Sequence, residues 1–196
     1  MLKVAVLVSG GGTDLQSIMD ACAAKEINAE VKLVISNRKS AYALERARSA
    51  GIRAEWIKDE DVILQCLEEM EIDLVVLAGY LAIVSDKLIN RYENRIINIH
   101  PSLIPAFCGP GFYGLHVHEA ALKRGVKVSG ATVHIVSTVV DGGPIILQEA
   151  VDISDLTTAE EIQARVLKLE HRILPKAVGL FADDRIQVVG ERVIIK

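Results

Sequence analysis

An apolar segment followed directly by three glycines is the feature that most constrains the fold of this chain. Residues 4–8 read Val-Ala-Val-Leu-Val, and Ser9 then leads into Gly10, Gly11 and Gly12. A continuous apolar run predicts a strand that is buried on both faces, as strands of parallel sheets are. Apolar residues then recur at helical spacing on one face: Leu15, Ile18, Met19 and Cys22. This order of strand, glycine turn and helix predicts the first unit of a parallel α/β sheet.

The same alternation continues along the chain. Apolar runs predict strands at residues 31–35, 73–78, 96–100, 131–136 and 144–151, and periodic segments predict helices at 41–50, 62–70, 86–92 and 117–124. The pattern therefore predicts an α/β fold, with a Rossmann-like, mostly parallel sheet and helices on both faces.

Local signals mark the turns and ends in the last third of the chain. The turn Asp141-Gly142-Gly143 is expected to use the glycines for positive φ angles. Thr158 and Glu161 form a capping-box pattern at the start of a long helix, which we expect Pro175 to kink or end. Gly190-Glu191 is suited to a type II′ turn between strands at 186–189 and 192–195, which predicts a C-terminal hairpin.

Length and charge exclude several classes of protein. The chain has 196 residues, which predicts one domain, and a formal net charge of -4 with no run of basic residues, which argues against nucleic-acid or membrane partners. No secretory signal or membrane-length apolar stretch is recognised. The three cysteines are far apart in the sequence, which fits a reducing, cytoplasmic location. We expect small-molecule substrates, no metal, and a monomer or homodimer.

The glycine loop is a candidate anion site. Backbone N–H groups at the start of the following helix face a bound phosphate favourably. The loop is neither a G-x-G-x-x-G fingerprint nor a Walker loop, so dinucleotide or nucleoside triphosphate binding is not indicated. The alternative is a tight turn capped by Thr13 or Asp14.

A second candidate site lies at the end of the strand predicted at 96–100. Asn98 and His100 are two residues apart and point to the same side, at the edge where α/β sheets bind ligands. An amide beside an imidazole can stabilise an oxyanion and supply a proton. Asp141 would favour the imidazolium form if the fold brings it to His100. The alternatives are a structural histidine and an aspartate that only forms a turn.

The remaining histidines and cysteines carry weaker signals. The His116 and His118 pair is weak evidence for a metal. His134 is expected to be structural, although it and Thr132 share a face with the candidate site. Cys108 lies in a glycine-rich loop at 107–114 without a base fixed beside it, and the other two cysteines are expected in the core.

Four segments together resemble the phosphoribosylglycinamide formyltransferase family. They are Ser-Gly-Gly-Gly-Thr-Asp-Leu-Gln at 9–16, Leu-Ala-Gly-Tyr at 77–80, Asn-Ile-His-Pro-Ser-Leu-Ile-Pro at 98–105 and Asp-Gly-Gly-Pro at 141–144. The resemblance runs over nearly the whole chain. It implies transfer of a formyl group from 10-formyltetrahydrofolate to the amine of phosphoribosylglycinamide, in purine synthesis. It also implies that Asn98 and protonated His100 hold the oxyanion, with His100 as general acid and Asp141 keeping it charged.

The resemblance implies the binding residues as well. Gly11, Gly12, Thr13 and Asp14 would cradle the substrate phosphate, and Glu170 would hold the glycinamide end. The folate would occupy a slot formed by Leu81, Ala82, Ile83, Val84, Asn98, Val140 and Asp141. His116 and Thr132 are second-tier candidates. We expect one formyltransferase domain over residues 1–196, whose half at about 1–100 binds phosphate and whose half at about 101–196 carries the folate and catalytic functions.

The chain departs from the family pattern at several places. Position 14 is often Asn in the family, Ala82 stands where many members have Arg, and Leu167 replaces a residue that is often polar. Two related enzymes share the His-Pro-Ser-Leu-Ile-Pro segment: 10-formyltetrahydrofolate hydrolase and methionyl-tRNA formyltransferase. Both are expected to need more chain than is present. A non-catalytic protein that binds folate or a phosphosugar is a third alternative, and the presence of Asn98, His100 and Asp141 argues against it.

Overall fold

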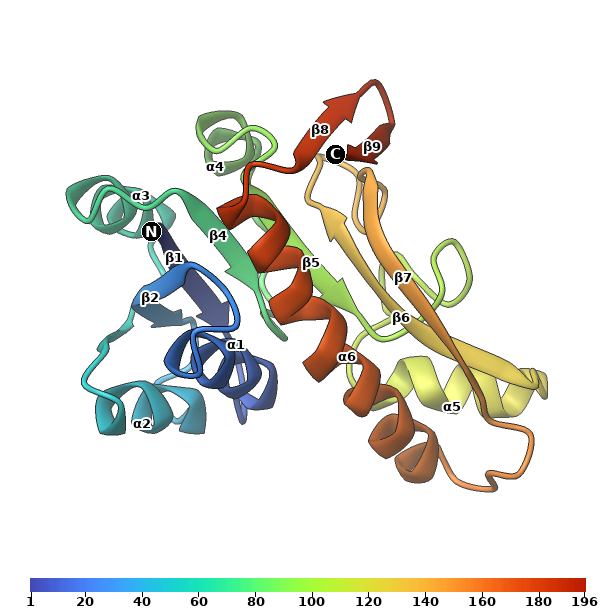
Figure 1. The fold of residues 1–196 in the computed structure, drawn as a ribbon. Coiled ribbons are helices and arrows are strands. Elements are labelled where there is room, and N and C mark those ends of the chain that lie inside the picture. Colours follow the sequence, from blue (N-terminus) through green and yellow to red (C-terminus); the bar gives the residue numbers. More distant parts are fainter.

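The computed structural model describes residues 1–196, and its centre is one seven-stranded sheet (Figure 1). The strand order is β3-β2-β1-β4-β5-β6-β7. The first five of these strands run parallel, and β6 and β7 are antiparallel additions at one edge. The strands are β1 (Leu2–Val8), β2 (Ala29–Ser36), β3 (Arg53–Trp56), β4 (Leu74–Leu77), β5 (Ile96–His100), β6 (Val128–Ile135) and β7 (Ile145–Asp152). Because the chain moves outward from β1 to β3 and then returns to β4, the strand order reverses between β1 and β4, where such sheets bind ligands.

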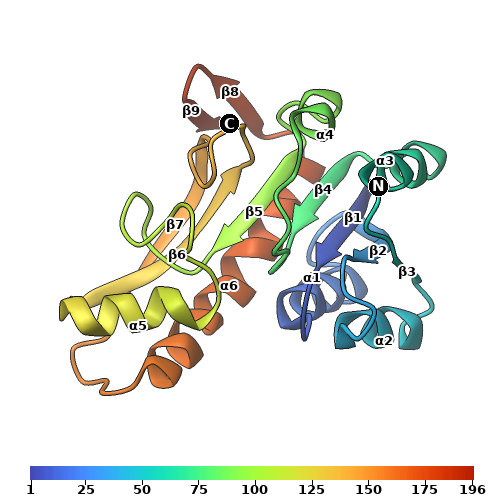
Figure 2. The ribbon, with the colours of Figure 1, turned by 180° about the vertical axis from the view of Figure 1, so that it is seen from behind.

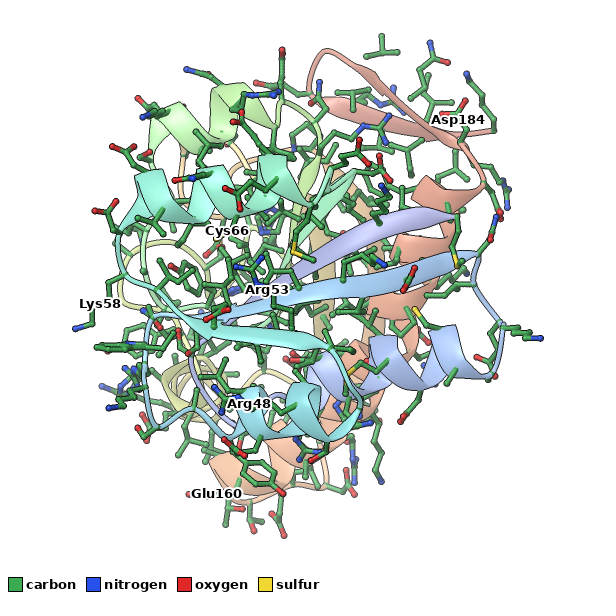
Figure 3. The ribbon with its side chains drawn as sticks, turned by 90° about the vertical axis from the view of Figure 1, so that its left-hand side faces the viewer. Arg48, Arg53, Lys58, Cys66, Glu160 and Asp184 are labelled. Atoms are coloured by element: carbon green, nitrogen blue, oxygen red, sulfur yellow. The ribbon has the colours of Figure 1, made fainter.

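Six helices cover the two faces of the sheet. They are α1 (Thr13–Ala23), α2 (Tyr42–Ser49), α3 (Glu60–Glu69), α4 (Asp86–Arg91), α5 (Leu115–Arg124) and α6 (Ala159–Ala182). Side chains of α1, α2 and α6 share one buried cluster, and those of α3 and α4 share another on the opposite face. α5 packs against α6. Figure 2 shows the sheet from behind, and Figure 3 shows the layers from the β3 edge, with Cys66 of α3 above Arg53 of β3.

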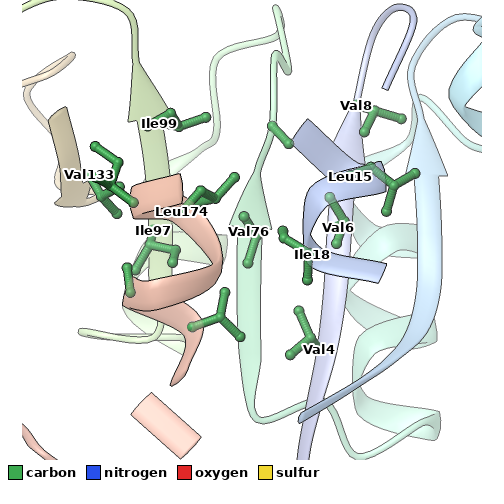
Figure 4. Packing of buried hydrophobic residues seen from close by; sticks show 14 of the residues in the cluster. Val4, Val6, Val8, Leu15, Ile18, Val76, Ile97, Ile99, Val133 and Leu174 are labelled. Carbon is green, nitrogen blue, oxygen red and sulfur yellow. The ribbon is translucent and has the colours of Figure 1, made fainter. Parts of the chain in front are cut away.

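The alternation of side chains along β1 explains why helices are needed on both sides. Val4, Val6 and Val8 pack in the cluster with Leu15 and Ile18 of α1 (Figure 4). The intervening Ala5 and Leu7 pack in the other cluster. All seven residues are buried. A central parallel strand therefore has no solvent face, which is the reason that its sequence is continuously apolar.

The predicted α/β class, mostly parallel sheet and helices on both faces are confirmed, together with the C-terminal hairpin of β8 (Ile186–Val189) and β9 (Arg192–Ile195). Gly190 in its turn has φ +59°. The capping box of Thr158 and Glu161 is also present. β3 was not predicted, because this short edge strand carries charged and half-exposed residues rather than an apolar run. No helix is both long enough and apolar enough to cross a bilayer.

The expectation that Pro175 could end the last helix is wrong. α6 continues through Pro175 to Ala182. A proline inside a helix costs about 3 kcal/mol. The residues around it offset this cost, since Ile173, Leu174 and Val178 are buried in the core and each such side chain contributes roughly 1.5–3 kcal/mol.

The expected use of Gly142 and Gly143 for positive φ angles is also wrong. The positive φ in this turn belongs to Asp141 itself, at +54°. The glycines are required for space instead, because a Cβ on Gly143 would lie 1.9 Å from the carbonyl oxygen of Ile135. The turn thus holds the Gly143 backbone, two residues after Asp141, close against the end of β6.

Candidate active site

Two neighbouring cavities open at the carboxyl ends of the parallel strands. The first, which we call the glycine cavity, has a volume of about 340 Å³ and is lined by residues 10–14, His118 and Glu170. The second, the apolar cavity, has a volume of about 390 Å³ and includes residues 81–84 and 137–141 with Asn98 and His100. Gly79 and Pro101 line both cavities. The fold therefore joins the two candidate sites of the sequence into one region beside the reversal of strand order.

The glycine loop is shaped by its contacts with α2. Gly12 is the N-cap of α1 and has φ +74°, and no side chain caps the helix. The alternative of a cap by Thr13 or Asp14 is therefore wrong. Gly10 accepts a hydrogen bond from the Ala43 N–H at 3.1 Å, and Gly11 accepts one from Arg46 Nε at 2.8 Å. These two hydrogen bonds from α2 fix the position of the loop. The first-turn N–H groups of α1 have no acceptors within the helix.

Two carboxyl groups meet in the glycine cavity. Glu170 of α6 is only 6% exposed, and Asp14 of α1 lines the same cavity. Asp14 Oδ1 lies 3.7 Å from His171 Nε2, and neither atom has a hydrogen-bond partner. Burial raises the pKa of Asp14 to about 6. Burial and the charge of Asp14 raise the pKa of Glu170 well above its usual range.

Asp141 lies between two imidazoles at the inner end of the apolar cavity. Its Oδ2 is 3.6 Å from His100 Nδ1, and its Oδ1 is 3.6 Å from His134 Nε2. The N–H of Gly109 donates to Asp141 Oδ2 at 2.8 Å. β5 and β6 place the histidines because Asn98 pairs with His134 in the antiparallel register. Asn98 Nδ2 lies 3.1 Å from His134 Nε2.

The pKa values of this group follow from burial and mutual charge. Burial lowers the pKa of His100, and this outweighs the opposite effects of the Phe107 carbonyl and Asp141. The charge of Asp141 raises the pKa of His100, as expected, but in this conformation burial lowers it by more. Burial acts to raise the pKa of Asp141, but contacts with His134, Gly109 and His100 leave it below its usual range. The carboxylate is therefore charged at neutral pH.

Both ring nitrogens of His100 face oxygen acceptors. Nε2 lies 2.9 Å from the Phe107 carbonyl oxygen, and Nδ1 faces Asp141. Phe107 begins the glycine-rich loop and has a positive φ of +49°. An imidazole ring with an oxygen acceptor beside each nitrogen can donate to both acceptors only as an imidazolium. Protonation of His100 thus depends on how closely this loop and Asp141 approach the ring.

The predicted folate-slot residues line one cavity. Leu81, Ala82, Ile83, Val84 and Val140 all lie in its wall with Asn98 and Asp141. Val84 is buried, whereas Ile83 at the rim is 83% exposed. Phe112 and Tyr113 also line the cavity. These aromatic residues were not among the predicted site residues, because their loop carries no periodic pattern.

The second-tier candidates lie outside both cavities. The His116 side chain is exposed and pairs with Glu119 at 3.0 Å. Thr132 is fully buried, and its hydroxyl donates to the Ser102 carbonyl and accepts from the Ile104 N–H, so it supports the loop after β5. Two histidines that the sequence analysis did not select, His118 and His134, line the cavities instead. The sequence signal for His134 was its alternation with Thr132, which predicted that the two share a face with the candidate site.

The sequence and fold match known formyltransferases. The model of the formyl transferase family matches residues 2–178. A curated phosphoribosylglycinamide formyltransferase of Haemophilus influenzae is 39% identical, over 96% of this chain and 91% of its own length. The chain belongs to the phosphoribosylglycinamide formyltransferase family. It is therefore a one-carbon group transferase, as the motifs predicted.

Solved structures agree with this membership. Glycinamide ribonucleotide transformylase 1 of Symbiobacterium toebii superimposes with a TM-score of 0.93 and 44% identity, over 100% of this chain and 94% of that one. A formyltetrahydrofolate deformylase of Pseudomonas syringae also superimposes, with a TM-score of 0.89 and 25% identity, over 99% of this chain and 65% of that one. The phosphoribosylglycinamide formyltransferase family thus shares its fold with an enzyme named for a hydrolytic reaction.

Proposed function

We propose that this chain transfers the formyl group of 10-formyltetrahydrofolate to the amine of phosphoribosylglycinamide. The observation that carries the proposal is the Asp141 carboxylate, held 3.6 Å from both His100 and His134 in the wall of the apolar cavity. That cavity shares Gly79 and Pro101 with the glycine cavity. One cavity suits a flat apolar ring, and the other suits a phosphorylated acceptor. The catalytic group lines the first of these cavities, and the second adjoins it at Gly79 and Pro101, so a bound folate and a bound acceptor would be neighbours.

The proposed chemistry is addition of the amine to the formyl carbon, followed by loss of the folate nitrogen, with a net transfer of one proton from the amine to that nitrogen. Negative charge develops on the formyl oxygen during the addition. Asn98 Nδ2 carries two hydrogens, so one can bond His134 while the other donates to this oxygen. His100 supplies the second donor and the proton that the reaction needs, as a general acid, once its Nε2 exchanges the Phe107 carbonyl for the formyl oxygen. Removing one such donor typically costs about 3 kcal/mol of transition-state stabilisation.

Asp141 is proposed to favour the protonated, charged form of His100. In this structure the contact is 3.6 Å long and burial lowers the pKa of His100. A shorter contact, together with negative charge on the bound formyl oxygen, favours the imidazolium form. Asp141 is already ionised and is anchored by the Gly109 N–H. It therefore acts on the reaction through His100.

The acceptor is proposed to bind in the glycine cavity. The acceptor phosphate is proposed to contact backbone N–H groups of Gly11, Gly12, Thr13 and Asp14, which form the turn into α1 and its first two residues. Glu170 lies in the same cavity and is proposed to hold the glycinamide end. The proposed folate site uses Leu81, Ala82, Ile83 and Val84 with Val140 in the apolar cavity. The proposed folate site thus contains residues from both halves of the chain.

The three cysteines are free thiols, which supports a reducing, cytoplasmic location.

The test is a formyl-transfer assay with 10-formyltetrahydrofolate, run with and without phosphoribosylglycinamide. We expect tetrahydrofolate to form only when the acceptor is present. Release of formate without the acceptor would favour the hydrolase that the deformylase fold suggests. His100→Ala should lower kcat about a hundredfold or more with little change in acceptor KM. A large rise in KM at unchanged kcat would contradict the assigned role.

A further inference from the structure

Asp14 occupies an electrostatically unfavourable place. It is the second residue of α1, beside the glycine loop, and its side chain is 13% exposed. Glu170, another acid, lines the same cavity. Backbone N–H groups at this helix end favour an anion, but two ionised carboxylates in the cavity would repel it. Under the proposed function, this is where the acceptor phosphate binds.

No nearby base compensates the two acids. On α6, His171 approaches Asp14 Oδ1 at 3.7 Å, but burial lowers the pKa of His171 despite the opposing charge of Asp20. On α2, Arg46 is engaged by the Gly11 carbonyl and Gln16. Across the cavity on α5, burial and the charge of His100 lower the pKa of His118 to about 4. At neutral pH both histidines are therefore largely uncharged.

Unpartnered buried atoms mark this cavity as a ligand site. His118 is 1% exposed, and its Nδ1 has no hydrogen-bond partner. Asp14 Oδ1 has none either. Buried polar atoms normally have partners, and an atom without one carries a desolvation cost. A hydroxyl or phosphate group bound in the cavity can supply a partner for His118, which lines it.

We propose that Asp14 and Glu170 take up one proton when a phosphorylated acceptor binds, so that Asp14 meets the phosphate as a neutral carboxylic acid. The proton comes from solvent. It removes the charge next to the phosphate and makes the Asp14 hydroxyl a hydrogen-bond donor. Asp14 thereby determines how acceptor affinity depends on pH. This inference rests on the proposed acceptor site and not on the formyl-transfer step.

Linkage gives the expected size of the effect. If binding takes up one proton, the affinity of the acceptor falls up to tenfold for each pH unit above the titration of the pair. In Asp14→Asn the amide is permanently neutral and still donates a hydrogen bond. We therefore expect the variant and the wild-type chain to bind alike near pH 6. At pH 8 the variant should bind the acceptor at least about tenfold more tightly than the wild type does.

The experiment is calorimetric binding of phosphoribosylglycinamide, without folate, in Tris and HEPES at pH 6–8.5. The dependence of the binding heat on buffer ionisation gives the number of protons taken up. Wild type should take up close to one more proton than Asp14→Asn at pH 8. Asp20→Asn is the matched control, because Asp20 is an exposed acid on the same helix that bonds Gln16. It should behave as the wild type does.

Three outcomes overturn the inference. They are equal proton uptake by the wild type and Asp14→Asn, parallel pH profiles of affinity for the two, and uptake that survives in Asp14→Asn but disappears in Glu170→Gln. The last result would place the proton on Glu170. Formyl transfer is assayed separately, so an active enzyme without proton uptake contradicts this inference alone. Proton-linked binding without any transfer would contradict the proposed reaction alone.

Discussion

At the scale of single residues, the central feature is an aspartate shared by two histidines. Asp141 holds one carboxylate oxygen toward each ring, at 3.6 Å. Asn98 in turn contacts the second ring through its amide. The four side chains form one network, so a change at any member alters the charge or the orientation of its neighbours.

Asp141→Asn should slow formyl transfer by shifting the titration of His100. The amide oxygen can still accept the Gly109 N–H, but the negative charge that raises the pKa of His100 is lost. If protonated His100 is the active form, kcat falls as pH rises through the pKa of His100. In the variant this fall should occur at lower pH, with about a tenfold or greater loss at neutral pH. The measurement is the pH profile of kcat.

A suitable control for this prediction is Asp184→Asn. Asp184 is exposed and has a positive φ of +52°, close to the +54° of Asp141. Asn tolerates this backbone conformation in the same way as Asp does. The control should keep the wild-type profile, and an unshifted profile in Asp141→Asn would exclude the His100 pairing.

At the scale of elements, glycines decide how closely the site loops approach the rest of the fold. Gly12 lies against α2, where an added Cβ would come within 2.5 Å of the Ala43 Cβ. Gly10, two residues earlier, has open space around it and no positive φ. Two glycines of one loop therefore have different structural requirements.

Gly12→Ala should destabilise the protein by about 2–4 kcal/mol. The left-handed conformation costs about 1–2 kcal/mol in a residue with a Cβ, and the clash with α2 adds an overpacking cost of similar size. Gly10→Ala is the matched control and should change the free energy of unfolding by no more than about 0.5 kcal/mol. Urea unfolding of both variants measures the difference. Equal stability of the two would show that the loop is not packed against α2.

Gly143→Ala should reduce both stability and activity. The new Cβ would meet the Ile135 carbonyl oxygen, so the turn that carries Asp141 must move. We expect a cost of about 3 kcal/mol and a lower kcat, because Asp141 leaves its place beside His100. In Gly142→Ala the added Cβ would lie 2.6 Å from Cγ1 and 2.8 Å from Cβ of the exposed Val139, so this surface turn must also shift. We expect that variant to lose less stability than Gly143→Ala, because its nearest backbone atom is the Val139 carbonyl oxygen at 3.4 Å.

At the scale of the whole molecule, the buried ionisable groups give stability a dependence on pH with opposing contributions. The pKa of His118 is about 4 against an ordinary value of 6.5, because burial and His100 disfavour its charged form. The unfolded chain therefore binds this proton first as pH falls. Asp14, whose pKa is raised by burial to about 6, acts in the opposite sense, since the folded chain binds its proton first.

His118→Asn isolates one of these contributions. The stabilisation from neutral His118 is fully present above pH 6.5 and is lost as pH falls toward 4. Its size is about 3 kcal/mol, from 1.36 kcal/mol per pKa unit. The difference in free energy of unfolding between wild type and variant should shrink by about this amount between pH 7 and pH 4. Denaturant unfolding at each pH measures it, and a constant difference would refute the shifted titration.

Much of the fold and part of the candidate site were predictable from the sequence alone. The run at residues 4–8 determined a buried central strand, because only apolar side chains can occupy both faces of such a strand. The residues Asn98, His100 and Asp141 carried the resemblance to the family, since the motifs are local. Pro175 shows the limit of local signals, because burial of its neighbours outweighs the local preference.

Only the tertiary structure decided which distant groups share a site. The antiparallel register of β5 and β6 brings His134 to Asn98, and the packing of α1 on α6 brings Asp14 and Glu170 to one cavity. Neither pairing has a local sequence signal. Charge and pKa also depend on burial, which a sequence does not display. The sequence thus determined the elements and the reactive residues, whereas long-range packing determined their partners and protonation, because both depend on distances through space.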